Sequence, residues 1–507
     1  MKSSRTGKVL ALSLGQALTN VVALVSGMVL ARVLSKTDLA TYRQTMLAYD
    51  VVLPLLSLGL ASGVYYFLPT EKNRARGVVV DGLVLMVGMG LLYAIFIALG
   101  GNHLLAKRFS NPAIVSTLAY LVPLPILMLP ARLMPSVMVV QNQVQKLTVY
   151  NVLTSLFLAV SVIAACLLWK TPDAMVLMRV AVSLGIGAIG IHLMLQAVPR
   201  DSWQPSWTNM KRMVAYSIPM VGAAAMGTIA IQLDKLIVSS MCPPEQFAVY
   251  SNGAIEIPLV AILTGSITSV IQPELRRMVV AEDFASALAL FRQASEKSAV
   301  ILLPTMVFLL VSAKSFILTL FSAKYFGSVL PFQLYLLILP VRIVNYGAFM
   351  MALGKNRLIM YRAMTGLVAN FILSIILVHW IGYIGAILGT ILTLYTINCA
   401  LNFTVISRAV GCHWWEVLPF PSLFQLLGGA VLAALPVLLI GYLPWRLPPV
   451  GMLAVNSVVF ALALALVAWV LKITAYQVEV RRAWNKVSAY YQAGAHRFFG
   501  RRPPAGV

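Results

Sequence analysis

Apolar residues dominate the chain in runs of about 20, and short polar segments separate these runs. A helix needs roughly 20 apolar residues to cross the hydrocarbon core of a bilayer, because it rises about 1.5 Å per residue. The pattern therefore predicts an all-α polytopic membrane protein with about 14 transmembrane helices. We place them at residues 9–34, 43–68, 78–100, 115–140, 147–169, 174–198, 213–240, 248–273, 297–320, 329–353, 357–379, 383–407, 418–442 and 449–472.

The polar segments between the runs indicate how the chain is oriented. Most of the 38 Lys and Arg residues fall on the side of the membrane that holds the N-terminus, and an excess of Lys and Arg marks the cytoplasmic side. We therefore expect both termini to be cytoplasmic. The longest internal connection, residues 276–297, has the pattern of an amphipathic cytoplasmic helix.

The C-terminal segment, residues 474–507, is basic, and its apolar residues follow a helical spacing. Two interpretations stay open. The segment is either an amphipathic cytoplasmic helix that lies on anionic membrane lipids or a solvated basic tail with little helix.

Composition narrows the class of protein. Of the 507 residues, 60% are hydrophobic and 10% are charged, whereas ordinary soluble domains carry about 25% charged residues. This excludes a soluble enzyme, a disordered chain and a coiled-coil scaffold. The net charge is +23, but the basic residues lie in the gaps between apolar runs, so no nucleic acid partner is expected. The 4 cysteines are scattered without metal-ligand spacing, and we expect no metal site.

The chain contains an internal duplication. Leu129-Pro130-Ala131-Arg132 returns as Leu339-Pro340-Val341-Arg342, at an offset of 210 residues. Residues 146–150 match 357–361 at an offset of 211, and residues 39–42 match 247–250 more weakly at 208. Each match falls in the equivalent span of its half. Because an even number of spans is repeated, the repeat is parallel, about an axis along the membrane normal.

The duplication predicts two six-helix lobes around a central cavity, and transport by alternating access. The N-terminal lobe comprises residues 1–200 and the C-terminal lobe residues 201–410. Residues 411–473 form two extra helices outside the repeat.

Two arginines stand at equivalent positions of the two repeats. Arg132 and Arg342 each follow a proline by two positions, and proline loosens a helix and frees a backbone carbonyl. A charge near the bilayer centre costs about 2.5–3.5 kcal/mol, so such a residue usually faces a cavity or a partner. One interpretation is a clamp on an anionic headgroup, since a guanidinium fork suits phosphate oxygens. The alternative is that each arginine braces its own lobe.

We single out five further ionisable residues within predicted spans as candidates. Asp50 and Glu256 occupy equivalent spans, and a buried carboxylate can carry a proton or hold Na⁺, so ion coupling is one hypothesis and neutralisation of nearby cations is the other. Asp234 and Lys235 are expected to form a structural or cavity ion pair with charges on other spans, and the alternative is that Lys235 extends its side chain to the membrane surface. Arg179 either lines the cavity or extends its side chain to the nearby membrane surface.

No motif for nucleotide binding, serine hydrolysis, zinc proteolysis or glycosyl transfer occurs in the sequence, and no outer loop is long enough to house a glycosyl-transfer site. We therefore expect a transporter and not an enzyme. It needs no cofactor, and its driving force is an H⁺ or Na⁺ gradient or the gradient of its own substrate.

Several short motifs occur one after another along the chain, and together they form an ordered set. They are Ala31-Arg32-Val33-Leu34-Ser35 with Ala40-Thr41-Tyr42, Tyr216-Ser217-Ile218-Pro219, Gln232-Leu233-Asp234-Lys235-Leu236-Ile237, Val249-Tyr250-Ser251 and Gly382-Tyr383-Ile384-Gly385-Ala386. This set resembles the polysaccharide-transport family, the O-antigen flippase-like branch of the multidrug/oligosaccharidyl-lipid/polysaccharide exporter superfamily, over most of residues 9–407. One departure is that Ala40-Thr41-Tyr42 lacks the glycine that the family usually places before this tyrosine.

The resemblance implies a bilobed, V-shaped fold with a cationic cavity in the bacterial plasma (inner) membrane. It also implies flipping of an undecaprenyl-diphosphate-linked oligosaccharide from the cytoplasmic to the outer leaflet, for lipopolysaccharide or exopolysaccharide export beside polysaccharide polymerase and assembly proteins. A diphosphate carrier suits the paired arginines.

Three other functions stay open: cation-coupled multidrug efflux, lipid II flipping, and a membrane glycan polymerase or ligase. Cavity arginines argue against cationic drugs as substrates. A polymerase or ligase needs a catalytic constellation on an outer loop, and the predicted loops are too short for one.

Overall fold

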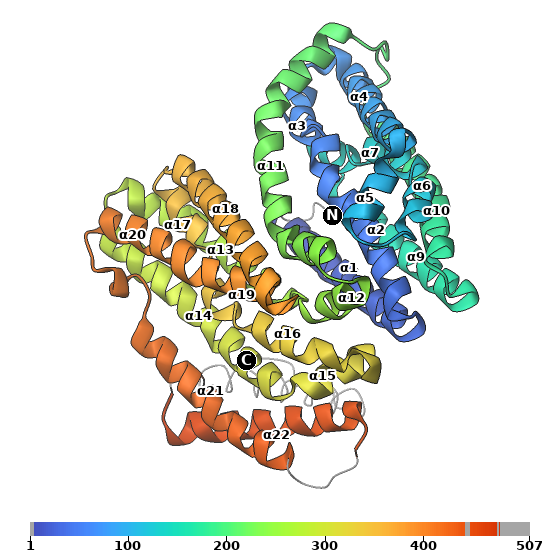
Figure 1. The fold of residues 1–507 in the computed structure, drawn as a ribbon. Coiled ribbons are helices and arrows are strands. Elements are labelled where there is room, and N and C mark those ends of the chain that lie inside the picture. Colours follow the sequence, from blue (N-terminus) through green and yellow to red (C-terminus); the bar gives the residue numbers. More distant parts are fainter. Residues whose placement is uncertain (1–4, 442–446, 474–475, 477–507) are drawn as a thin grey trace, which may run out of the picture. The chain divides into compact units, whose positions relative to one another are not determined.

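The computed structural model describes residues 5–441, 447–473 and 476, and every regular element among them is helical (Figure 1). The α-helices up to residue 241 are α1 (Arg5–Val33), α2 (Lys36–Leu56), α3 (Leu60–Thr70), α4 (Ala75–Phe96), α5 (Asn102–Arg108), α6 (Ile114–Tyr120), α7 (Pro123–Ala131), α8 (Met134–Val140), α9 (Val144–Trp169), α10 (Pro172–Ala197) and α11 (Trp207–Met241). Those that follow are α12 (Pro244–Gly253), α13 (Pro258–Val280), α14 (Phe284–Val311), α15 (Ala313–Phe321), α16 (Val329–Leu336), α17 (Tyr346–Ala352), α18 (Asn356–Ile381), α19 (Ile384–Thr393), α20 (Cys399–Val410), α21 (Phe420–Gly441) and α22 (Pro449–Val470). Short 3-10 segments are η1 (Lys72–Arg74), η3 (Ala323–Ser328), η4 (Leu339–Arg342) and η6 (Trp414–Glu416), and π segments are η2 (Ile97–Gly101) and η5 (Leu394–Asn398).

The length and apolar character of the helices confirm the prediction of an all-α, multi-pass membrane protein. Within the described residues, 10 helices are long and apolar enough to cross a membrane, and the number rises to 12 if each of two bent helix pairs is one span. The count of 14 spans stays a prediction. The expected amphipathic tail, residues 474–507, lies outside the described residues apart from Tyr476.

The connection expected at residues 276–297 is not a separate helix. α13 continues to Val280 and α14 begins at Phe284, so a short turn joins them. Asp283 caps α14, because its side chain accepts a hydrogen bond from the backbone N of Ser286 at 3.0 Å. Hydrogen bonds from Ser286 lower the pKa of the exposed Asp283 carboxyl. The polar residues of this stretch therefore mark the ends of two long helices, which the sequence pattern alone did not distinguish from a helix of their own.

The helices pack into two units. Unit one comprises residues 1–262, 320–335 and 356–398, and unit two comprises residues 263–319, 336–355 and 399–507. These units do not coincide with the lobes expected at residues 1–200 and 201–410, and the lobe boundaries stay a prediction. The difference arises because α11 and α12, which follow residue 200, pack against α2 of the first repeat.

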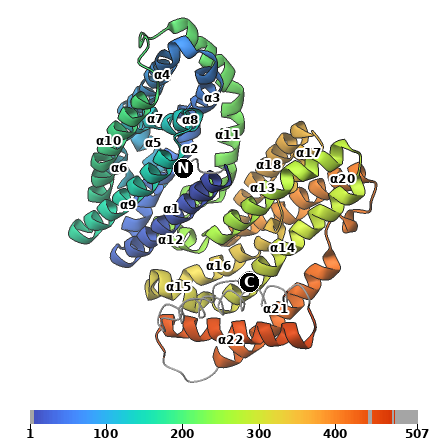
Figure 2. The same cartoon turned by 180° about the vertical axis from the view of Figure 1, so that it is seen from behind.

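In unit one, α4, α7 and α10 lie side by side, and α9 packs against both α1 and α10 (Figure 2). α11 has 35 residues, or about 52 Å of helix, and packs against α3 (Figure 1). Tyr66 and Tyr216 stack at this contact with ring centroids 4.4 Å apart. Gly59 precedes α3 with φ +60°, and a Cβ there would meet the Ser217 carbonyl oxygen at 3.1 Å, so both the backbone turn and the close approach of α11 require glycine.

In unit two, α14 packs against α21, and α21 packs against α22. A buried hydrogen bond from Asn456 Nδ2 to Ser312 Oγ (3.2 Å) ties α22 to the end of α14. Arg276 of α13 donates to the carbonyl oxygen of Ala352, the last residue of α17, where a cation also complements the helix dipole.

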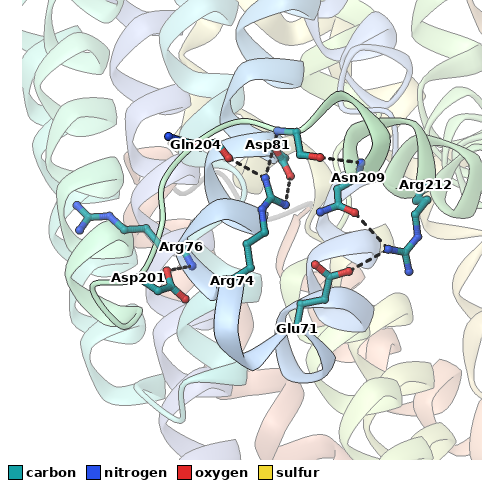
Figure 3. Close-up of polar contacts among 9 residues, drawn as sticks. Glu71, Arg74, Arg76, Asp81, Asp201, Gln204, Asn209 and Arg212 are labelled. Carbon is teal, nitrogen blue, oxygen red and sulfur yellow. Dashed lines mark hydrogen bonds and ion pairs between the residues drawn. The ribbon is translucent and has the colours of Figure 1, made fainter.

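A buried ion pair fixes the linker between α10 and α11 (Figure 3). Asp81 of α4 has 0% exposure, and Arg74 reaches it with Nη1 to Oδ2 at 2.8 Å and Nη2 to Oδ1 at 3.3 Å. Arg74 Nη2 also donates to the Gln204 carbonyl oxygen at 2.8 Å, and the Ser206 backbone N donates to Asp81 Oδ1 at 2.7 Å. Arg74 and Asp81 thus neutralise each other and also hold the linker between α10 and α11, which joins the two repeats, to the start of α4.

Replacing Arg74 by Met should destabilise the protein strongly, because it leaves the Asp81 carboxylate buried without its counter-charge. Breaking a buried pair from one side costs about 3–5 kcal/mol, whereas an exposed pair contributes about 1 kcal/mol or less. The matched control is Arg212→Met, which removes the more exposed Arg212–Glu71 pair (3.2 Å) nearby. Thermal unfolding in detergent should show a much larger fall for Arg74→Met, and Arg74→Met/Asp81→Leu should recover part of it. Equal falls for the two single variants would contradict this assignment.

Candidate functional site

Four of the predicted site residues belong to unit one, and three of them are cations within electrostatic range of the fourth, a carboxylate. Asp50 lies on α2 and is half-buried. Its carboxylate experiences the charges of Arg179 on α10, Arg132 at the end of α7 and Lys235 on α11, with Arg179 the strongest. The sequence places these residues on four separate spans, and the packing of α2 against α10 and α11 unites them.

The cluster carries an excess of positive charge. Among the residues that the structure describes, Arg132, Arg179 and Lys235 form no ion pair within 4 Å, with Asp50 or with another carboxylate. One carboxylate at longer range cannot neutralise three cations. Because charges act over longer distances where water is scarce, this cluster attracts anions.

Tyrosines surround the cationic cluster. Tyr42 accepts a hydrogen bond from Arg179 Nη1 at 3.4 Å, and the buried Tyr49 packs edge-on against Tyr93 with ring centroids 6.3 Å apart. Arg179 Nε is buried and has no hydrogen-bond partner among the described residues. Arg179 therefore points into the packed interior toward Tyr42, and not to the membrane surface, so its guanidinium keeps a donor for a further acceptor.

The repeated Leu-Pro-x-Arg motif interrupts the helix in both halves, where the sequence pattern predicted two unbroken spans loosened by proline. α7 ends at Ala131, Arg132 is its C-cap and is exposed, and α8 begins at Met134. In unit two, Arg342 ends the short segment η4 and is half-buried. A clamp formed by Arg132 and Arg342 together stays a prediction.

Asp234 forms no ion pair within 4 Å among the described residues, so the expected ion pair with a charge on another span is absent. Consecutive helical residues point about 100° apart, and Asp234 faces Tyr250 of α12, whose hydroxyl donates to Asp234 Oδ2 at 2.6 Å. Asp234 is 7% exposed and Tyr250 is 0% exposed. A neutral donor thus satisfies this buried carboxylate, while Lys235 belongs to the cluster around Asp50.

Tyr250 and Tyr42 are equivalent residues of the two repeats, at the offset of 208. Tyr250 donates to a carboxylate, whereas Tyr42 accepts from an arginine. The same side chain therefore serves opposite charges in the two repeats, which is possible because a phenol both donates and accepts.

Glu256 has different surroundings from Asp50. It is exposed and lies in the irregular segment between α12 and α13, whereas Asp50 lies within a helix. Ion coupling by either carboxylate stays a prediction. Among the described residues, no group of three or more His, Cys, Asp or Glu side chains is arranged to hold a metal ion.

Sequence reasoning missed Arg43. Its Nη1 donates to Ser251 Oγ at 2.8 Å and its Nη2 to Asn252 Oδ1 at 2.6 Å. Arg43 is the first residue of a predicted span, where a cation is expected to face water, so composition gave no reason to select it. The signal that points to it is the repeat, because Ser251 stands 208 residues after Arg43.

Comparison with known proteins gives a family and a fold. The model of the family described as "Polysaccharide biosynthesis protein" matches residues 29–330, more than half of the chain. No curated protein sequence matches. Among solved structures, the chain is similar to the lipid II flippase MurJ in an inward closed conformation, with a TM-score of 0.69, 12% identity, 91% of this chain and 99% of that one covered.

Two further similar structures are multidrug resistance MATE family transporters of the MOP superfamily. The inward-facing one has a TM-score of 0.58 and 15% identity, with 79% of this chain and 98% of that one covered. The outward-facing one has a TM-score of 0.55 and 13% identity, with 80% and 96% covered. At these identities the similarity shows the fold alone. Family and fold together support a membrane flippase or exporter rather than an enzyme.

Replacing Tyr250 by Phe should destabilise the protein, because the buried Asp234 carboxylate loses its hydroxyl donor. A buried acceptor left unsatisfied costs about 1–3 kcal/mol. The control is Tyr361→Phe, which removes the hydroxyl of a tyrosine that is 58% exposed. Thermal unfolding of the two purified variants measures the difference, and identical stability would show that Asp234 does not depend on Tyr250.

Proposed function

The chain belongs to the polysaccharide biosynthesis protein family, and from this premise we propose that it flips a polyprenyl-diphosphate-linked oligosaccharide, a polysaccharide repeat unit, from the inner to the outer leaflet by alternating access. The membrane is the bacterial inner membrane, with both termini cytoplasmic. Polysaccharide polymerase and assembly proteins receive the product.

The observation that carries this proposal is the uncompensated cationic cluster of Arg132, Arg179 and Lys235 around Asp50. A diphosphate is the most densely charged part of the substrate and the part that lipid excludes most strongly. Guanidinium groups bind phosphate oxygens through two parallel hydrogen bonds, and Arg179 Nε is a buried donor without a partner among the described residues. The cluster thus offers charge and donors where a headgroup needs both.

Arg342 is the second element of the proposal. It follows the same proline motif as Arg132, so the repeat supplies one arginine at a helix interruption in each half. In alternating access the two halves move around one fixed substrate site, and two equivalent arginines, one from each half, suit such a site.

Asp50 provides a route to ion coupling. A bound diphosphate competes with the Asp50 carboxylate for the same cations. Binding of H⁺ or Na⁺ to Asp50 then relieves the repulsion between carboxylate and substrate. Because of this competition, binding of the ion to Asp50 favours binding of the substrate to the cations, and this link is the basis of ion-coupled transport.

Lipid II flipping is the second candidate, because the fold resembles that of a lipid II flippase over 91% of the chain. Cation-coupled multidrug efflux suits the site less well, because the cluster repels cationic drugs. A glycan polymerase or ligase lacks support from the family and the similar structures.

The variant Arg132→Ala/Arg342→Ala should block flipping while the protein still folds and inserts. Loss of one charge-assisted hydrogen bond is worth about 1.5–3 kcal/mol, so flipping should fall at least about 10-fold. The measurement is mass spectrometry of polyprenyl-diphosphate glycans from cells that depend on the variant, with their accessibility tested from outside. The control is Arg108→Ala, which removes an exposed cation on α5.

An externally inaccessible glycan lipid that accumulates in the double variant supports the proposal and identifies the substrate. Accumulated lipid II supports the second candidate. Accumulation in the outer leaflet points to a polymerase or ligase, and normal flipping by the double variant rejects the arginine clamp.

Asp50→Asn should remove the dependence of flipping on the ion gradient, because an amide cannot bind a proton or replace a carboxylate for Na⁺. Glu256→Gln tests the equivalent span in the same way, and Glu274→Gln is the control at an exposed pair (3.5 Å from Arg277). Flipping is followed in intact cells with and without a proton or sodium ionophore. If Asp50→Asn and Glu256→Gln both remain as sensitive to the ionophore as the parent protein, neither carboxylate couples transport.

A further inference from the structure

Arg43 joins the two repeats at equivalent positions. Residues 39–42 match 247–250 at an offset of 208, and this offset makes Arg43 equivalent to Ser251 and Gln44 equivalent to Asn252. Arg43 donates to Ser251 Oγ at 2.8 Å and to Asn252 Oδ1 at 2.6 Å. Two equivalent residues related by a rotation can touch only near the rotation axis. The contact between α2 and α12 therefore lies at the axis of the repeat.

The residues beside Arg43 extend this contact into a buried polar network. Gln44 is 0% exposed, its Nε2 donates to Ser239 Oγ of α11 at 2.9 Å, and its Oε1 accepts from Asn111 Nδ2 at 2.7 Å. Asn111 also donates to Thr41 Oγ1 at 2.9 Å. One turn of α2 is thus bonded by side chains to both α11 and α12, at the end of α2 that the charge pattern places outside the cell.

The charge of Arg43 has no carboxylate to neutralise it among the described residues. Its hydrogen-bond partners are neutral, and the titratable groups that act on it are Tyr325 and Tyr42. An arginine held by neutral groups exchanges its partners for water at little cost when it becomes solvated, unlike one held by a buried ion pair. The contact is therefore reversible once water can enter.

Two buried hydrogen-bond donors near Arg43 that lack an acceptor within the part of the chain that the structure describes also indicate that the contact between α2 and α12 is reversible. Asn252 Nδ2 and Tyr325 Oη are buried and have no hydrogen-bond partner among the described residues, and Tyr325 is 0% exposed. Such groups destabilise the closed arrangement and gain water when it opens.

We propose that Arg43 is a latch that keeps the outer side of the transporter closed, bonds α2 to α12 at the repeat axis, and must release Ser251 and Asn252 before substrate can leave. This inference rests on the proposed alternating-access function. Asp50 follows Arg43 on α2 by seven residues, or about two helical turns on the same face. A movement of α2 that opens the latch therefore also moves the carboxylate of the cationic cluster.

Outer accessibility tests the latch without reference to any substrate. Cys166, Cys242, Cys399 and Cys412 are first replaced by Ala, and Ser239→Cys then places one buried thiol beneath the latch. Intact cells are treated with a membrane-impermeant maleimide, and the labelling rate is measured. Arg43→Ala should raise this rate about 10-fold. Arg43→Lys should raise it less, because an ammonium still donates to one partner although it lacks the fork that reaches both.

The control for charge is Lys107→Ala, an exposed cation at the end of α5. It should leave the labelling rate unchanged. If Arg43→Ala labels no faster than the parent, or if Lys107→Ala labels equally fast, Arg43 is not a latch.

A second experiment distinguishes failure of the latch proposal from failure of the proposed substrate. A short thiol-reactive cross-linker joins cysteines introduced by Arg43→Cys and Ser251→Cys, and flipping of the accumulated glycan lipid is followed before and after reduction. Flipping that stops on cross-linking and resumes on reduction supports the latch, whereas undiminished flipping by the cross-linked protein overturns it. If depletion cells accumulate no glycan lipid but Arg43→Ala still raises labelling, the proposed substrate is wrong and the latch stands.

Discussion

A charge within a bilayer needs a counter-charge, a polar partner or a route to water, and this requirement governs the interior of the molecule. The ionisable residues of the described helices meet it in three ways. Asp81 takes a full ion pair from Arg74, and Asp234 takes a neutral hydroxyl from Tyr250. Arg132, Arg179 and Lys235 share one distant carboxylate, so their requirement is only partly met. The first two arrangements suit fixed structure, and the third suits a site that an anion completes.

The duplication gives the two halves the same parts but lets them diverge. The Leu-Pro-x-Arg motif interrupts a helix in each half, because proline removes a backbone donor in either context. Tyr42 and Tyr250 are equivalent but serve an arginine and a carboxylate respectively. Arg43 meets the neutral Ser251 at the equivalent position, and a repeat that had kept arginine at both would have opposed two like charges. Divergence at this pair is therefore a physical condition for contact at the axis.

α2 links the two functional proposals. Its outer half carries Arg43 and Gln44, which bond to α12 and α11, and two turns further on it carries Asp50 within the cationic cluster. A rigid helix transmits displacement along its length, so opening at Arg43 changes the distances around Asp50. The same helix thus connects access from outside with the charge balance of the site.

Periodicity and composition by themselves determined the class of the protein and its all-helical fold, because a bilayer imposes helix length and hydropathy on every segment independently of its neighbours. The prolines before Arg132 and Arg342 indicated where both helices are loosened, since the effect of proline is local, but the sequence pattern still predicted two unbroken spans there. Only the tertiary structure decided which charges meet. Asp234 bonds to the neutral Tyr250 and not to a cation, Arg179 bonds to Tyr42, and Arg43 joins α2 to α12. Partners on different helices depend on how those helices rotate and pack, and no local pattern in the sequence encodes that.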